Sequence, residues 1–167
     1  MSDIVNRVAQ SSLVIFDLEE HYPEGQRMVL DIANWLYEGL ILREKEFRIL
    51  AAEHNWEEYR GGYVALHCSS DAVIPGWAYM LVGSKLQPHA KKTVIGDLEQ
   101  LETALYQSAL DSLDLSPFVN KPVIIKGCSQ KPVPANAYLW ACSKVQTVAK
   151  SVMYGEACSS VPLFKRK

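Results

Sequence analysis

PGWAYMLVGSKLQPHAKKTVIG, residues 75–96, is repeated further along the chain as PANAYLWACSKVQTVAKSVMYG, residues 134–155. Without a gap, the two stretches match at nine of 22 positions. Ordinary residue frequencies give roughly one or two matches over such a length. A Cys-Ser pair precedes each copy, at Cys68 and at Cys128. The pattern predicts a duplicated unit of strand, Cys-Ser loop, proline-started helix and strand.

The sequence around the repeats alternates between strand and helix patterns. Apolar runs predict short strands at 63–66, 93–96, 123–126 and 152–154, and helical spacing predicts helices over 75–87, 97–110 and 134–148. Parallel neighbours in a sheet need a helix-sized connection. This order therefore predicts an α/β fold with a mostly parallel sheet from two duplicated βαβ units, repeat 1 over residues 63–97 and repeat 2 over residues 122–156.

Residues 1–60 are predicted to form an extension of this sheet. Two β-rich runs, 13–18 and 26–32, flank the turn-like sequence at 21–25 and predict an antiparallel β-hairpin. Residues 33–59 show helical spacing interrupted by Gly39, which predicts one broken helix or two helices. At 167 residues, the whole chain is expected to be a single α/β domain.

Composition excludes several classes of protein. The formal net charge of −2, with no basic cluster except the last three residues, argues against a nucleic-acid-binding surface. The apolar runs are short and the N-terminus lacks the layout of a signal peptide, so we expect no membrane partner and a cytoplasmic location. In that compartment the four cysteines are expected to be reduced.

Three of the cysteines are predicted to share a site. Cys68, Cys128 and Cys158 follow strands of the predicted parallel sheet, and ligands of such sheets bind at the carboxyl edge. Thiolates bind zinc and iron, so these three are predicted metal ligands, and zinc or iron is the expected cofactor. A fourth ligand would come from His67, Asp97, Glu156 or water. Cys142 falls in mid-helix and is predicted to be a packing residue.

Two alternatives remain open. Cys128 lies among lysines and before a helix N-terminus, which would favour a thiolate nucleophile in a thiol-dependent enzyme. Only His67 is placed near enough to serve as its base, so the balance is against an enzyme. Alternatively, the repeat is purely architectural, and the protein is a structural or interaction domain without a metal.

Four stretches carry a resemblance to a known family: YVALHCS at 63–69, AKKTVIGDLE at 90–99, IKGCS at 125–129 and GEACSSVP at 155–162. They resemble the uncharacterised bacterial family called domain of unknown function 2480, found in Bacteroidetes-type bacteria. The resemblance extends over almost the full chain, including residues 3–9. It implies a cytoplasmic protein and no established activity. It also implies a link to iron–sulfur assembly proteins as partners, and so an accessory role in cluster, metal or sulfur handling.

Overall fold

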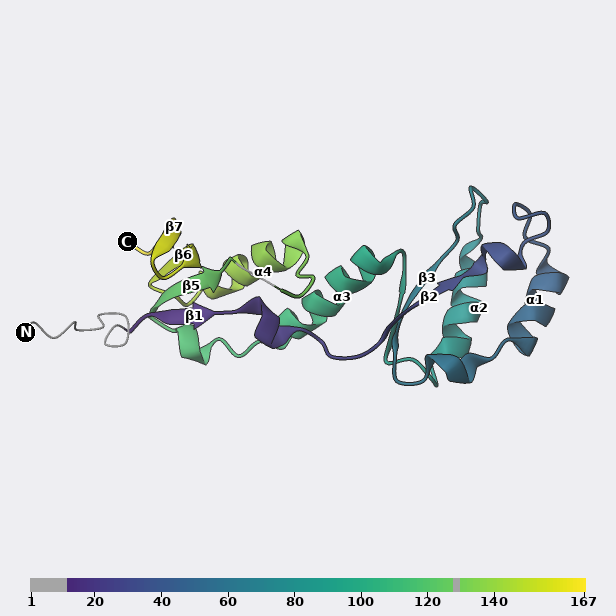
Figure 1. Ribbon diagram of the computed structural model, residues 1–167, viewed down its shortest axis with the longest axis horizontal. Coiled ribbons are helices and arrows are strands. Elements are labelled where there is room, and N and C mark those ends of the chain that lie inside the picture. The colour runs from purple at the N-terminus through teal and green to yellow at the C-terminus, as the bar shows by residue number, and fades with distance from the viewer. Residues whose placement is uncertain (1–11, 128–129) are drawn as a thin grey trace, which may run out of the picture. The chain divides into compact units, whose positions relative to one another are not determined.

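The computed structural model describes residues 12–127 and 130–167. These residues form two compact units, whose elements are labelled in Figure 1. Unit 1 comprises the described parts of residues 1–23 and 105–167, and unit 2 comprises residues 24–104. Unit 2 is therefore inserted in the sequence between the two parts of unit 1. Each unit has its own β-sheet.

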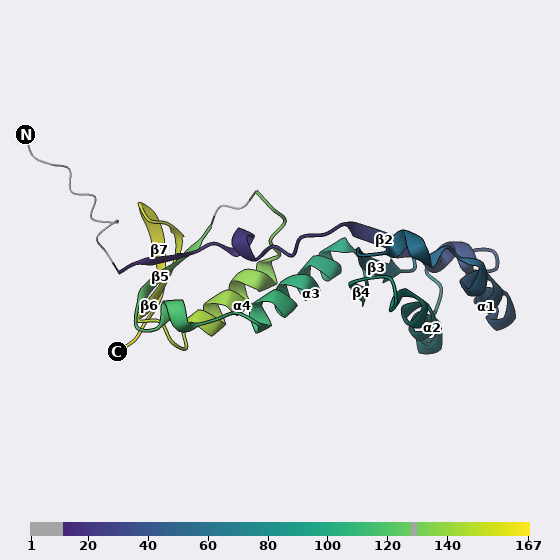
Figure 2. The same ribbon diagram turned by 90° about the horizontal axis from the view of Figure 1, so that it is seen from below.

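Unit 2 is built around a three-stranded parallel sheet with the order β2-β3-β4. Its elements are β2 (Arg27–Asp31), the 3-10 helix η2 (Ile32–Trp35), α1 (Glu44–Glu53), η3 (Trp56–Tyr59), β3 (Tyr63–His67), α2 (Gly76–Leu86) and β4 (Lys92–Ile95). Helix α3 (Leu98–Asp111) begins in unit 2 and ends in unit 1. Helix α2 connects β3 to β4 and lies along one face of the sheet (Figure 2).

The core of unit 2 lies between this sheet and its helices. Every fourth residue of α2, Ala78, Val82 and Leu86, is fully buried, so one stripe of the helix packs onto the sheet. Val64 and Leu66 of β3 belong to the same cluster. This helix stripe and the buried central strand account for the βαβ pattern that the sequence predicts.

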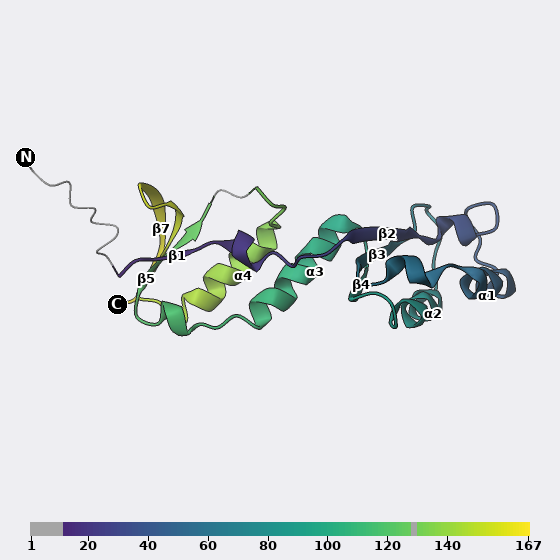
Figure 3. The same cartoon turned by 60° about the horizontal axis from the view of Figure 1, so that its bottom comes forward.

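Unit 1 contains a four-stranded sheet with the order β1-β5-β6-β7. Its elements are β1 (Val14–Phe16), η1 (Leu18–His21), η4 (Ser116–Phe118), β5 (Pro122–Lys126), α4 (Ala135–Val145), β6 (Ser151–Glu156) and β7 (Ser159–Lys165). The first three strands of the sheet are parallel, and β7 pairs with β6 in the antiparallel sense. The C-terminal part of α3 lies beside α4 (Figure 3).

The core of unit 1 repeats that of unit 2. Ala137, Ala141 and Val145 form the buried stripe of α4, at the positions that match the stripe of α2 in the sequence repeat. They pack with Val123 and Ile125 of β5. The α/β class and the two duplicated, largely parallel βαβ units are therefore confirmed.

The predicted single sheet is wrong, because the two repeats lie in separate sheets. The predicted N-terminal hairpin is wrong as well. Strand β1 pairs with β5, and β2 pairs with β3, both in the parallel sense. The runs at 13–18 and 26–32 are alike because each contains the first strand of its own unit. Two similar β-rich runs with a turn-like sequence between them have the same pattern as a hairpin. Ser159–Lys165 form β7, a strand beyond the last one that the sequence predicts, at 152–154.

The duplication also extends to these first strands. Phe16 of β1 lies opposite Ile125, and Leu30 of β2 lies opposite Leu66, which is the position equivalent to Ile125. In both units an aspartate follows, and its side chain caps a 3-10 helix. Each unit thus consists of a first strand with an Asp at or directly after its end, a second strand, a helix and a third strand.

The last strand of each βαβ unit reaches a glycine with positive φ. Gly96 has φ of 139° and Gly155 has φ of 125°. A capping box beside Gly96 begins the helix predicted from residue 97: the Asp97 N–H donates to Gln100 Oε1 (2.8 Å), and the Gln100 N–H donates to Asp97 Oδ1 (2.9 Å). A Cβ at Gly155 would lie 2.5 Å from the carbonyl oxygen of Ser159, a backbone atom.

Gly155→Ala should therefore destabilise the protein by about 1–3 kcal/mol, because it adds both a strained conformation and a backbone clash. Gly83→Ala is the matched control, since a Cβ there meets nothing within 4 Å and the residue lies in α2. The control should raise stability by about 0.4–1 kcal/mol. Urea unfolding of the three proteins measures both effects, and equal stability of Gly155→Ala and the wild type would contradict the expectation.

Candidate functional site

The carboxyl edges of the two sheets carry the residues that the sequence singled out. In unit 2, β3 ends at His67, and Cys68 follows directly. The last residue of β2, Asp31, lies opposite His67 in the strand register. The parallel register of β2 and β3 thus brings a carboxylate, an imidazole and a thiol to the same end of one sheet.

The side chain of Asp31 binds the backbone of the Cys-Ser loop of unit 2. Its Oδ1 accepts the N–H of Ser69 at 3.0 Å and the N–H of Ala33 at 2.9 Å. Burial raises the pKa of Asp31, but hydrogen bonds from Ser69 and Ala33 and the charge of His67 outweigh it, so the pKa lies below its usual value. The ionised carboxylate therefore fixes the start of the loop relative to β2.

Cys68 is a half-buried free thiol. Its Sγ lies 3.2 Å from Ser70 Oγ and 3.8 Å from the Ser70 carbonyl oxygen. The pKa of Tyr79 on α2 is raised, by burial first and then by the charge of Cys68. The thiol of unit 2 thus packs against the core of that unit and also contacts the hydroxyl group of Ser70.

Unit 1 repeats this arrangement with different side chains. Asp17 follows β1 as Asp31 ends β2, and Lys126 occupies the position of His67. Lys126 Nζ lies 2.7 Å from Asp17 Oδ2. The hydrogen bond and charge of Asp17 raise the pKa of Lys126. Burial opposes ionisation of Asp17, yet bonds from Lys126 and the Glu19 N–H lower its pKa overall.

A second carboxylate holds the Cys-Ser loop of unit 1. Glu19 Oε1 accepts the backbone N–H groups of Gln130 and of Lys131, the latter at 2.8 Å. Glu19 belongs to η1, which Asp17 caps through the Glu19 N–H at 2.9 Å. In both units, therefore, carboxylates at the end of the first strand bind the backbone of the loop that contains the cysteine.

Two cysteine loops follow neighbouring strands of unit 1. In the parallel register of β5 and β6, Lys126 lies opposite Gly155. Cys128 comes two residues after Lys126 in the sequence and itself lies outside the described residues. Cys158 lies in the two-residue connection between β6 and β7, because Glu156 pairs with Ser159, and it is an exposed free thiol.

The structure places Cys68 in unit 2 and Cys158 in unit 1. The prediction that three thiolates meet relied on one continuous sheet, and the two repeats lie in separate sheets. Over residues 12–127 and 130–167, no group of three or more His, Cys, Asp or Glu side chains is arranged to hold a metal ion. The three-cysteine ligand set stays a prediction, with Cys128 outside the described part of the chain.

Cys142 packs as the sequence predicts. It lies on α4 against the core of unit 1, and burial raises the pKa of its thiol. The sequence interpretation missed the two aspartates, Asp17 and Asp31. A signal for them exists, since VIFDL at 14–18 and MVLDI at 28–32 share an apolar run, an Asp and a following apolar residue.

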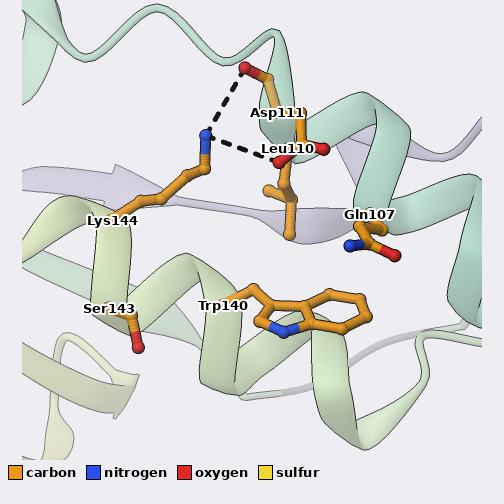
Figure 4. A pocket seen from close by; sticks show the side chains of 6 residues that line it. All are labelled: Gln107, Leu110, Asp111, Trp140, Ser143 and Lys144. Atoms are coloured by element: carbon orange, nitrogen blue, oxygen red, sulfur yellow. Dashed lines mark hydrogen bonds and ion pairs between the residues drawn. The ribbon is translucent and has the colours of Figure 1, made fainter.

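A small pocket lies between α3 and α4 in unit 1 (Figure 4). Its volume is about 130 Å³, and Trp140 and Leu110 form part of its wall. Lys144 Nζ lies 3.8 Å from Asp111 Oδ1 and donates to the Asp111 carbonyl oxygen at 3.4 Å. An ion pair thus closes one side of the pocket, whose volume suits a few water molecules.

Fold and site together define a class: an α/β protein made of two nested βαβ units, each with a carboxylate-held Cys-Ser loop at the carboxyl edge of its sheet. The chain belongs to the family of proteins of unknown function DUF2480, whose model matches residues 2–166. No curated protein and no solved structure matches it. Within the described residues, no helix has the length and apolar character needed to cross a bilayer.

Asp31→Ala should destabilise the protein by about 0.5–2 kcal/mol at neutral pH, because it removes the side-chain cap of η2 and the acceptor of the exposed Ser69 N–H. Because the pKa of Asp31 is lower in the folded protein than in the unfolded chain, where it is near 3.8, its ionised carboxylate stabilises the fold at pH values above 3.8. This stabilisation is lost as the pH falls through the pKa of the folded state. The difference between the wild type and the variant should therefore shrink below pH 3.8. Urea unfolding at pH 7 and at pH 3 measures it.

Asp31→Asn is the matched control, since an amide oxygen still accepts both N–H groups and asparagine is a good N-cap. It should cost less than Asp31→Ala. A loss of stability that is the same for both variants and at both pH values would show that the carboxylate does not hold the loop.

Proposed function

We propose that the carboxyl edge of the unit 1 sheet binds a thiophilic metal ion, zinc or iron, with Cys128 and Cys158 as thiolate ligands. One observation carries this proposal: β5 and β6 are paired neighbours, with Lys126 opposite Gly155. In the sequence, Cys128 comes two residues after Lys126, and Cys158 comes three residues after Gly155. Ligands from loops that follow adjacent parallel strands converge at such an edge.

Carboxylates near this edge can complete the coordination. Glu156 ends β6, and its charge contributes to the raised pKa of Lys126, so its carboxylate lies within electrostatic reach of the end of β5. Zinc accepts thiolate sulfur at about 2.3 Å and carboxylate oxygen at about 2.0–2.2 Å in tetrahedral sites. Two thiolates, Glu156 and a water would form a site that keeps one exchangeable position.

Cys158 is exposed at a tight connection, so a metal bound there would be open to exchange with another protein. This feature supports an accessory role in metal supply or in iron–sulfur cluster assembly, with assembly proteins as partners. The family resemblance favours the same role. Cys68 carries the equivalent thiol of unit 2, and the Cys68→Ser variant described below tests whether it also binds the metal.

A second candidate is a thiol enzyme with Cys128 as its nucleophile. Lys126 favours it, because an ammonium group two residues before a thiol promotes the thiolate. The competing observation is that Lys126 already pairs with Asp17 at 2.7 Å, which reduces the positive charge available to a thiolate. The metal site is therefore the leading proposal.

Metal analysis tests it. Protein purified without air or chelator should contain about one zinc or iron per chain, and Cys128→Ser and Cys158→Ser should each lower the content at least tenfold. Cys142→Ser is the matched control, since Cys142 packs in α4 of the same unit and should leave the metal content unchanged. Cys68→Ser reports whether the thiol of unit 2 participates.

Absence of bound zinc and iron from the wild type, with no uptake on reconstitution, would contradict the proposal. Alkylation rates then examine the second candidate. A single Cys128 that reacts at least tenfold faster than Cys158, in protein without metal, would favour the thiol enzyme.

A further inference from the structure

Strand β4 of unit 2 has an open outer edge. It pairs with β3 on one side, and among the residues that the structure describes no strand pairs with it on the other. Ile95, its last residue, is 58% exposed. An unpaired edge presents N–H and C=O groups that can receive another strand.

A groove of about 420 Å³ lies beside this edge, between β4 and α2. Its walls include Tyr79, Met80 and Gly83 from the helix and Thr93 and Ile95 from the strand. Met80 is 70% exposed. A groove with apolar and polar lining residues thus runs along the outer edge of β4.

In unit 1 the equivalent edge is occupied. Strand β7 pairs antiparallel with β6, so that Phe164 lies opposite Val152 and Lys165 lies opposite Ser151. Phe164 packs against the core of unit 1. In the repeat, Val152 corresponds to Thr93 and Ser151 to Lys92. The groove of unit 2 is therefore the place that Phe164 and β7 cover in unit 1.

Burial at equivalent positions shows the effect of the added strand. Ala149 and Val152 of unit 1 are fully buried. Their counterparts in unit 2, Ala90 and Thr93, are only partly buried and line the groove. The same βαβ unit is thus complete with a fourth strand and open without one.

We propose that this edge binds an extended peptide segment of a partner protein, which adds to β4 as an antiparallel strand. The segment would carry a large apolar residue, such as Phe, opposite Thr93, and an acidic residue opposite Lys92. The strand would satisfy the backbone groups of β4, and its apolar side chain would fill the groove, as in other cases of strand addition.

The charge of the edge distinguishes the occupant from β7 itself. In unit 1, Lys165 lies opposite Ser151. In unit 2, Lys92 takes the place of Ser151, and its ammonium group keeps its positive charge while it donates to the Ala104 carbonyl oxygen at 3.2 Å. Like charges directly opposite each other in a sheet are unfavourable, and opposite charges are favourable. Lys91, beside it, is exposed and adds to the positive charge. An acidic residue next to an aromatic one therefore suits this edge better than the Phe-Lys pair of β7.

A second copy of the chain suits the edge less well. Two β4 strands paired about a two-fold axis centred on Thr93 would place Thr93 opposite Thr93, and a threonine does not fill the space that Phe164 fills in unit 1. A peptide of independent sequence can supply the missing aromatic side chain. The structure thus favours a partner segment over self-association.

Peptide binding to the full chain tests the proposal. The probe is a fluorescent peptide of residues 159–166 that carries Lys165→Glu, titrated by anisotropy and mapped by amide shifts in ¹⁵N-labelled protein. Shifts should appear at 92–97. The unmodified peptide and a Phe164→Ala peptide should each bind about tenfold more weakly, since each loses roughly 1.4 kcal/mol.

Protein variants locate the site. Ile95→Lys and Met80→Lys should each weaken binding at least tenfold. Leu139→Lys is the matched control, because Leu139 is the counterpart of Met80 on α4, is 63% exposed and lies outside this groove. It should leave the affinity unchanged.

Three results would overturn the proposal. The first is no binding at millimolar peptide. The second is amide shifts confined to residues 151–156, which would mean that the peptide exchanges with β7. The third is a concentration-dependent dimer in sedimentation that Ile95→Lys dissociates, which would make a second copy of the chain the occupant.

Discussion

The parallel pairing of β1 with β5 is the constraint on which the architecture depends. It joins Val14 to Val123, so the chain of unit 2 must fold within the connection between two neighbouring strands. The entropic cost of closing a loop grows only slowly with its length, so a long connection between paired strands costs little more than a short one. The Asp17–Lys126 ion pair lies directly beyond this pairing and links the same two segments. Unit 1 therefore tolerates a complete second unit inside its sequence.

Duplication accounts for the equivalent parts of the two units, and divergence accounts for their chemistry. Both units place an aspartate after the first strand and use it to cap a 3-10 helix. In unit 2 that aspartate also binds the Cys-Ser loop, whereas in unit 1 Glu19 takes over this task and Asp17 pairs with Lys126. A carboxylate that binds backbone N–H groups after the second strand is thus present in both units, while the last residue of that strand is His67 in unit 2 and Lys126 in unit 1. Unit 1 combines a lysine with carboxylates at its edge, and unit 2 combines a histidine with an aspartate.

Local patterns predicted the helices and strands well, because the apolar stripes of α2 and α4 and the capping box at Asp97 are encoded by residues close in sequence. The partners of the strands are not encoded locally. The runs of β1 and β2 are near in sequence and separated by a turn, yet each pairs with a strand much further along the chain. The same limit applies to the site: the cysteines were found from their spacing, but their meeting at one edge required a strand order that the sequence leaves open.

The two units differ most at their third strands, and this difference follows from where the chain continues. After β6, the chain turns at Ala157-Cys158 and returns as β7, which covers the edge and the core beneath it. After β4, the capping box at Asp97 starts α3 instead, and within residues 12–127 and 130–167 no strand covers the equivalent edge. The acidic residue after the glycine is thus used as a helix cap in one unit and precedes a strand connection in the other. An edge opened in this way exposes the apolar surface that a sheet with helices on it normally buries, which is why its covering by another strand is physically favourable.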